Sequence, residues 1–321
     1  MCVVTARPGG LDVLLTGLAR QDFTDFEVVL VDALYHRRRE LVADRFAQAK
    51  IRLTHTPPRQ RLFPVDGCPQ ARNAAIAKAR GDLLLWLVDY TYAPPGCLRE
   101  HWGIYEHFER ARAGMGAHRY LAPPALAYTL PEYAPIKRFA PNAEQGVTYQ
   151  YCEADSRQYA QELDAGVYDT VLYSLFHPPL DDPAQIDSLS EDPFFFQVDP
   201  KLHGTVGGDI GGNFFHAKNE GTALAWCLRA NGFDERYTGH LYDDTDFGWR
   251  LEHAGAKWVL LDASATVRIV NPRHFFPHLV RQAPLRAHLD RYEQRRTDPE
   301  AIESGNAYQL RDVRQVGVWY G

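Results

Sequence analysis

The sequence lacks the patterns that identify several common protein classes. No stretch reaches the roughly 18 consecutive apolar residues of a membrane-spanning helix. Its five cysteines are an odd number without a C-x-x-C pair, which argues against a disulfide framework or a structural zinc site and favours a reducing compartment. The opening MCVVTA resembles a strand more than a secretion signal. We therefore expect a soluble, cytoplasmic protein.

Charge and catalytic signatures exclude further classes. The net charge of −6 over 321 residues provides no bulk attraction to nucleic acid. RQRLF at 59–63 and YHRRRE at 35–40 could contribute to a local basic patch, but the simpler interpretation is solvated charge on a loop or helix. No H-E-x-x-H or G-x-S-x-G motif is present. GGDIGGN at 207–213 lacks both the G-x-G-x-x-G spacing and a following Gly-Lys-Ser or Gly-Lys-Thr. Zincin, hydrolase, dinucleotide-binding and P-loop interpretations therefore have no support.

The first hundred residues alternate between short apolar strands and helical patterns. Strands are expected at 2–5, 26–31, 51–54 and 83–88, and helices at 11–21, 40–49 and 70–80, the last ended by Gly81. This alternation predicts an α/β fold, with right-handed βαβ units and a mainly parallel sheet flanked by helices. In such sheets ligands bind beyond the carboxyl ends of the strands.

The composition divides the chain into four parts. Residues 1–122 carry the alternating pattern, and residues 207–270 return to regular periodicity after a break. Between them, 123–206 is rich in proline, tyrosine, acids and other aromatics, and we expect an irregular insert with some short strands and helices. Residues 271–321, rich in arginine and histidine, predict a C-terminal helical extension.

Polar residues stand where the predicted strands end: Thr5 with Arg7, then Asp32 and Asp89. Asp32 could accept hydrogen bonds from a ribose or a base edge, or could act as a cap or turn residue. A charge on Asp89 is tolerable if a metal, a ribose or backbone donors receive it. A single carboxylate is a weak metal signature, and Thr91 stands where a D-x-D motif would place a second acid.

Two predicted helices carry charged residues in their first turns. Arg72 lies where the helix dipole disfavours a cation, so it needs a diphosphate or a carboxylate as partner unless it faces solvent. The helix that begins in DDTDFGWRLEHAG carries Asp243, Asp244 and Asp246. Capping by Asp243 and pairing of Asp246 with Arg250 explain two of these acids, which leaves one carboxylate for general-base catalysis.

Together these segments resemble the family 2 glycosyltransferases of the GT-A fold. The resemblance rests on CVVTARPGGLDVLLTGLARQDFTDFEVVLVDA, ARNAAIAKARGDLLLWLVDYTYAP and NGFDERYTGHLYDDTDFGWRLEHAGAKWVLLDASATV, about two thirds of the chain in the family's order. It implies a Rossmann-like GT-A sheet in which 1–122 binds a nucleotide sugar and 207–270 forms the acceptor and catalytic half. It further implies inverting hexosyl transfer from a nucleotide-diphosphate sugar, for which we expect a UDP-sugar. The 123–206 insert has no counterpart that we identify.

The resemblance also implies roles for single residues. Those expected at the nucleoside and diphosphate are Thr5, Arg7, Asp32 and Arg72. Those expected to border the sugar and acceptor are Gly211, Gly212 and Asn213. Asp89 would face the ribose and a divalent metal, Mn or Mg. Asp244, with Asp243 as neighbour or substitute, would deprotonate the acceptor hydroxyl.

Two positions depart from the family pattern. Thr91 replaces the second, metal-binding acid of the D-x-D motif, and the late metal-binding histidine is replaced by Arg268 or displaced towards His274. The loss of two ligands weakens metal binding, and a cation such as Arg268 could neutralise the diphosphate instead. We therefore expect weak metal use or none, with Asp89 kept for the nucleotide.

The sequence leaves three functions open. The first is an active glycosyltransferase, and the second is a catalytically silent GT-A-like protein that binds a nucleotide or glycan through the aromatic insert. The third, a nucleotidylyltransferase, would need a Gly-rich, Lys-containing loop that is absent at 7–10. The acceptor (a glycan, a lipid-linked glycan, a protein or modified DNA) and the oligomeric state are not specified by any pattern.

Overall fold

A computed structural model describes residues 1–5, 11–59, 68–89, 91–107, 112–121, 209–212, 215–238, 242–269, 282–298 and 300–316. Three residues named above, Arg7, Asn213 and His274, lie outside these ranges, as does the whole 123–206 insert. The predicted domain boundaries stay predictions.

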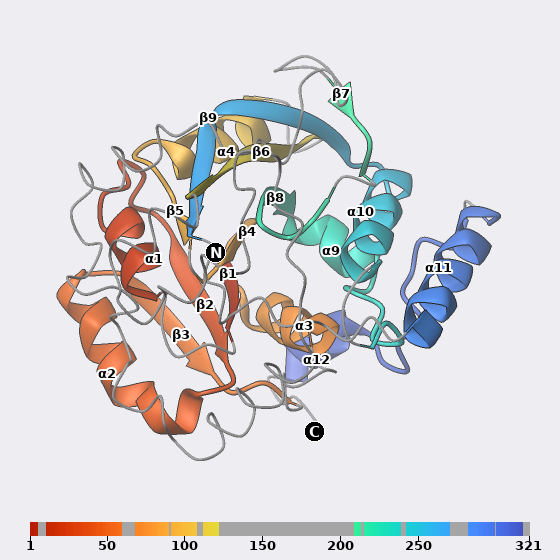
Figure 1. The fold of residues 1–321 in the computed structure, drawn as a ribbon, viewed down its shortest axis with the longest axis horizontal. Coiled ribbons are helices and arrows are strands. Elements are labelled where there is room, and N and C mark those ends of the chain that lie inside the picture. The colour runs from red at the N-terminus through yellow and green to blue at the C-terminus, as the bar shows by residue number, and fades with distance from the viewer. Residues whose placement is uncertain are drawn as a thin grey trace, which may run out of the picture.

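The described strands form one mixed sheet (Figure 1). Its parallel part runs in the order β3 (Arg52–Thr56), β2 (Glu27–Asp32), β1 (Cys2–Thr5) and β4 (Leu83–Val88). The sheet continues through β8 (Asn219–Ala223), β6 (Arg112–Leu121), β9 (Lys257–Ile269) and β5 (Thr91–Tyr92), and β7 (Asp209–Ile210) also pairs with β9. Strand β8 is antiparallel to β4, whereas β6 and β9 are parallel. The predicted α/β architecture with a mainly parallel sheet flanked by helices is confirmed.

Helices supply the crossovers that parallel strands require. They are α1 (Leu11–Leu18), α2 (Tyr35–Gln48) and α3 (Cys68–Lys78). Helix α2 begins five residues earlier than the apolar pattern indicates, because a polar first turn carries little periodicity. Helix α3 ends at Lys78, and the backbone N–H of Arg80 donates to Glu27 at 2.7 Å. The prediction that Gly81 ends this helix is therefore wrong.

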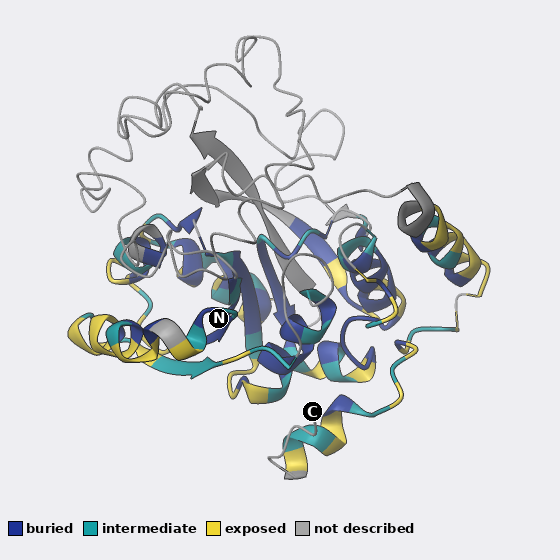
Figure 2. Cartoon of the chain, turned by 60° about the horizontal axis from the view of Figure 1, so that its bottom comes forward, coloured by how far each residue is buried: buried dark blue, intermediate teal, exposed yellow. Residues whose placement is uncertain are grey.

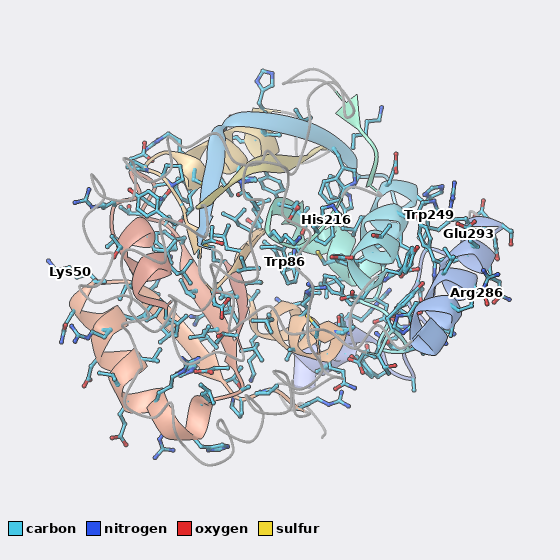
Figure 3. The ribbon with its side chains drawn as sticks, in the orientation of Figure 1. Lys50, Trp86, His216, Trp249, Arg286 and Glu293 are labelled. Atoms are coloured by element: carbon cyan, nitrogen blue, oxygen red, sulfur yellow. The ribbon has the colours of Figure 1, made fainter. Side chains whose placement is uncertain are left out.

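The two faces of the sheet bury separate apolar cores. Helices α1, α2 and α4 (Cys97–His107) cover one face, and α3, α9 (Leu224–Arg229), α10 (Asp243–His253) and α12 (Leu310–Val316) cover the other (Figure 1). Figure 2 shows buried strands between helices whose outer surfaces are exposed. Trp86 of β4 lies at the centre of the molecule (Figure 3), with its ring 5.3 Å from that of Phe233. Alternating apolar residues along β1, β2 and β4 supply both cores.

The predicted C-terminal helices are present as α11 (Gln282–Arg296) and α12. Arg295 of α11 lies 2.7 Å from the fully buried Asp234 and 2.6 Å from Asp246 of α10. Arg314 of α12 donates to the carbonyl of Ile76 at 2.6 Å, near the end of α3. The extension is thus held to the sheet domain by buried charge and helix-end contacts. None of the described helices is long and apolar enough to cross a bilayer.

Candidate functional site

Three predicted site residues meet at the carboxyl edge of the parallel strands. Thr5 is the register partner of Asp32, and Asp89 directly follows β4, whose Val88 pairs with Val4. The hydroxyl of Thr5 donates to Oδ2 of Asp89 at 2.6 Å. Both residues are buried. The strand ends therefore place a hydroxyl and a carboxylate together where an α/β sheet binds its ligand.

Asp32 is fully buried, and its carboxylate is satisfied by groups of the chain itself. Oδ1 accepts from the Leu34 backbone N–H and from Nη2 of Arg38, each at 2.8 Å. Oδ2 accepts from Nε of Arg38 at 2.8 Å and contacts Nε2 of His55 at 2.9 Å. Burial alone would raise the pKa of Asp32, but His55 and Arg38 hold it below its usual value. The turn alternative is therefore observed, and the nucleoside contact of Asp32 stays a prediction.

Arg38 joins the strand ends into one polar network. Its Nη2 lies 3.4 Å from the Thr5 hydroxyl. The same guanidinium forms a bidentate ion pair with the Asp32 carboxylate. The sequence patterns missed both Arg38 and His55. The available signal was weak: an arginine six residues after a strand-ending acid, inside a run interpreted as solvated charge. Hydrogen bonds thus connect Asp89, Thr5, Arg38, Asp32 and His55 into one network at this edge.

Thr91 and Arg268 occupy paired positions in the sheet. Strand β5 is antiparallel to β9, and Thr91 is the register partner of Arg268. Thr91 is completely buried, and its hydroxyl has no hydrogen-bond partner among the described residues. Within those same residues, no three His, Cys, Asp or Glu side chains gather where they could hold a metal ion together. Thr91 and Arg268 are therefore neighbours in the sheet, whereas His274, the alternative position of the late histidine, lies outside the described residues.

Arg72 has the carboxylate partner that its helical position predicts. Its Nη1 donates to Oδ2 of Asp243 at 2.5 Å, and its guanidinium lies 5.0 Å from the centre of the Phe233 ring. Burial disfavours the charge on Arg72, but Cys68, Asp243 and further acids raise its pKa above the usual value. Because α3 begins at Cys68, Arg72 lies in the second turn, not the first as predicted. The pair ties α3 to α10.

The two adjacent acids of α10 differ in environment. The Asp243 side chain is 3% exposed, and burial, reinforced by Asp244 and opposed by Arg72, raises its pKa to about 6. The Asp244 side chain is 14% exposed, and its Oδ2 lies 3.9 Å from Nδ1 of His216. Figure 3 shows His216 between β8 and α10. Asp244 is thus the more accessible carboxylate of the two.

The start of α10 differs from the capping that the sequence suggests. Tyr242, not Asp243, is the N-cap residue, and its side chain makes no capping hydrogen bond. Tyr242 has φ of 67°, a left-handed conformation that is uncommon outside glycine and asparagine and concentrates at functional sites. The predicted pair of Asp246 and Arg250 is confirmed at 2.7 Å, and both side chains are fully buried. Asp243 is therefore the first residue of the helix and not its N-cap, and its carboxylate is bound to Arg72.

The glycines expected near the acceptor lie against α10. The backbone N–H of Gly212 donates to Oε2 of Glu252 at 2.9 Å, and a Cβ on Gly212 would collide with the carbonyl of Gly248. Gly211 precedes this contact and is half-buried. The backbone of Gly212 thus approaches another part of the molecule closely, but the neighbour is helix α10 and not a ligand. Contact of Gly211 and Gly212 with sugar or acceptor stays a prediction.

Glu220 in β8 is a buried acid that the sequence patterns did not identify. It accepts backbone N–H groups from His216 at 3.2 Å, from Asn219 at 2.9 Å and from Lys218. Burial raises the pKa of Glu220 to about 7 against the lowering effect of these donors. Its negative charge also acts on Arg72. A strand of mixed small and polar residues, NEGTA, contains no periodic signal for such an acid.

Comparison with known proteins relates the fold to solved structures alone, since no protein-family model and no curated protein matches the chain. It resembles residues 1–349 of S. aureus TarS, with a TM-score of 0.51 and 12% identity; the match covers 84% of this chain and 59% of that 1–349 fragment. It also resembles the mannosyltransferase PcManGT from Pyrobaculum calidifontis, with a TM-score of 0.50 and 14% identity. That match covers 98% of this chain and 67% of the PcManGT chain. The third structure is GalNAc-T7, with a TM-score of 0.52 and 10% identity over 91% of this chain and 49% of the GalNAc-T7 chain.

The chain thus spans about half to two thirds of the lengths of these three proteins. Their low identity makes the likeness one of fold. The sheet order, the flanking helices and these neighbours together show that the chain has a GT-A-like fold.

Proposed function

We propose that this chain is a family 2-type, cytoplasmic glycosyltransferase that moves a sugar from a nucleotide-diphosphate sugar to an acceptor hydroxyl with inversion. Asp244 is the general base. Thr5, Asp89 and the Arg38–Asp32 pair form the nucleoside end of the site, and Arg7 and Arg72 lie towards the diphosphate. Gly211, Gly212 and Asn213 border the sugar and acceptor. A UDP-sugar is the first donor to test.

The unequal environments of the two acids in α10 carry this proposal. Arg72 binds Asp243 and keeps it buried, whereas Asp244 next to it is more exposed and 3.9 Å from His216. A general base must reach an acceptor hydroxyl, so it needs an accessible carboxylate on a rigid support. Asp243 and Arg72 supply the support, and Asp244 supplies the carboxylate.

The reaction is a single displacement at the anomeric carbon. Asp244 takes the proton of the acceptor hydroxyl as that oxygen forms its bond to the anomeric carbon. The bond from this carbon to the diphosphate oxygen breaks, and its electron pair leaves with the nucleoside diphosphate. Attack from the face opposite the leaving group inverts the configuration.

The structural neighbours support a nucleotide-sugar donor. PcManGT was solved with GDP-Man and Mn²⁺, and GalNAc-T7 with UDP, GalNAc and Mn²⁺. Their common donor class suits the polar carboxyl edge formed by Thr5 and Asp89. The acceptor class stays open among glycans, lipid-linked glycans, proteins and modified DNA.

A donor panel followed by turnover of two variants tests the proposal. Thermal shift against UDP- and GDP-sugars identifies the donor, because a ligand that binds the folded state raises its melting temperature. Hydrolysis of that donor, with water as acceptor, is then measured by release of the nucleoside diphosphate. Asp244→Asn should lower turnover by about 10²- to 10⁴-fold while donor binding persists. NMR of the first-formed anomer checks inversion.

Two further outcomes discriminate between alternatives. Asp290→Asn changes an exposed aspartate of α11 and serves as the matched control, with turnover expected at the level of the unmodified protein. If Asp243→Asn abolishes turnover and Asp244→Asn does not, Asp243 is the base. Donor binding without turnover for every sugar would instead support a silent nucleotide-binding protein, an alternative that Thr91 favours. Transfer of a nucleotidyl group would support the nucleotidylyltransferase alternative.

A further inference from the structure

The described residues at the carboxyl edge do not fit a divalent metal ion. Mn²⁺ and Mg²⁺ bind several oxygen ligands, commonly including more than one carboxylate or phosphate oxygen. Here Asp89 already accepts the Thr5 hydroxyl at 2.6 Å, and Thr91 contributes a neutral oxygen. Across the described part of the chain, no cluster of three potential ligands exists.

Thr91 also lacks the support that metal ligands receive. Groups that bind a metal are normally held by hydrogen bonds from a second layer of residues. The Thr91 hydroxyl is fully buried and makes no hydrogen bond to any described residue. This position is therefore packed as part of the strand pair and is not oriented as a ligand.

The register partner of Thr91 is an arginine, and its positive charge compensates for the absence of a metal ion. Arg268 occupies the β9 position opposite Thr91. A divalent cation together with two carboxylates carries no net formal charge, and neither does one arginine together with the single carboxylate of Asp89. Replacing an acid by threonine and adding an arginine thus preserves the charge balance without a metal. A fixed cation can stabilise a departing diphosphate as a metal does.

We propose, on the basis of the proposed function, that this chain binds its nucleoside diphosphate and expels it without a divalent metal, with Arg268 providing the positive charge. The bond between the anomeric carbon and the diphosphate oxygen breaks, and Arg268 stabilises the negative charge that this oxygen gains. Arg72 lies towards the diphosphate, but its charge already neutralises Asp243, so it does not supply the additional positive charge. Asp89 remains at the nucleoside.

Nucleotide binding with and without metal tests this inference. UDP and GDP are titrated calorimetrically into the full chain, once in EDTA and once in MnCl₂. The affinity of the unmodified protein should agree within about twofold between the two conditions. Arg268→Met should weaken binding by about tenfold or more in both, and Mn²⁺ should not restore it. Arg286→Met, on the exposed outer side of α11 (Figure 3), is the matched arginine control.

A rebuilt metal site makes the test decisive even if Arg268→Met folds poorly. The double variant Thr91→Asp/Arg268→His restores an acid and a histidine, so its binding should fall about tenfold in EDTA and recover in MnCl₂. Binding by the unmodified protein that requires Mn²⁺ overturns the metal-free inference but leaves the proposed function intact. Absence of nucleotide binding in both conditions overturns the proposed function and this inference together.

Discussion

Arg72 of α3 and Asp243 of α10 form a buried ion pair of 2.5 Å, although 171 positions separate them in the sequence. The pair joins the first half of the domain to the helix that carries the candidate base. Phe233 packs against the guanidinium from the segment between α9 and α10. The position of Asp244 relative to the strand ends therefore depends on a contact between distant parts of the chain.

Arg72→Met is expected to lower the free energy of unfolding by about 3 kcal/mol, because breaking a buried pair leaves one carboxylate without compensation. The pKa of Asp243, already about 6, should rise further when the cation is removed. Urea unfolding near neutral pH measures the loss. The double variant Arg72→Met/Asp243→Asn should recover part of it, since it removes the stranded charge. Strictly additive losses from the two single variants would contradict the pairing.

Neighbouring arginines in α2 provide a second, sharper comparison. Arg38 is buried against Asp32, whereas Arg39 is 56% exposed and lies 3.8 Å from Glu40. Arg38→Met should cost about 3 kcal/mol, and Arg39→Met should change the free energy of unfolding by less than about 0.5 kcal/mol. The same urea titration measures both. Equal effects would show that Arg38 does not hold the edge together.

That comparison also shows where prediction from sequence ends. In HRRRE the three arginines have the same local pattern, which does not indicate which of them is buried against a strand-ending acid. The four strands β1 to β4 and the helices between them could be predicted, because periodicity reports local burial. Thr5 and Asp89 could be predicted as neighbours, because parallel strands align their carboxyl ends.

Side-chain partners from distant segments could not be predicted in the same way. Arg72 called for an anionic partner, but the choice of Asp243 over a ligand depends on how α3 and α10 pack. Asp246 and Arg250 were expected to pair at i,i+4 spacing, and no pattern indicated that both side chains would be fully buried next to Arg295. Helical spacing predicts the pair but not its depth, because depth is set by α11, which covers it.

Glu220 should make stability depend on pH. Its pKa is about 7 in the folded state and 4.5 ordinarily, so folding favours the protonated carboxyl. The stabilisation is complete below the ordinary pKa and is lost as pH rises through the folded pKa, a change of about 2–3 kcal/mol. Asp243, raised to about 6, acts in the same direction at lower pH. Urea unfolding at about pH 5 and about pH 8 should therefore show lower stability at the higher pH.

Glu220→Gln isolates this contribution. The amide brings N–H donors towards backbone N–H donors, so the variant should be less stable at both pH values, with a smaller difference between them. Glu293→Gln, at a 55% exposed position, should keep the pH dependence of the unmodified protein. An undiminished pH difference in Glu220→Gln would assign the effect to another group.

Two glycines should respond in opposite directions to the same substitution. Gly103 is exposed within α4 with nothing near the place of a Cβ, so Gly103→Ala should stabilise the fold by about 1 kcal/mol through helix propensity. At Gly212 a Cβ would strike the carbonyl of Gly248 inside α10, so Gly212→Ala should destabilise by about 2 kcal/mol or more. Because α10 carries Asp244, turnover should fall as the helix is displaced, while Gly103→Ala keeps full turnover. If Gly212→Ala instead lowers donor affinity with no loss of stability, the close approach at Gly212 serves the ligand rather than the helix.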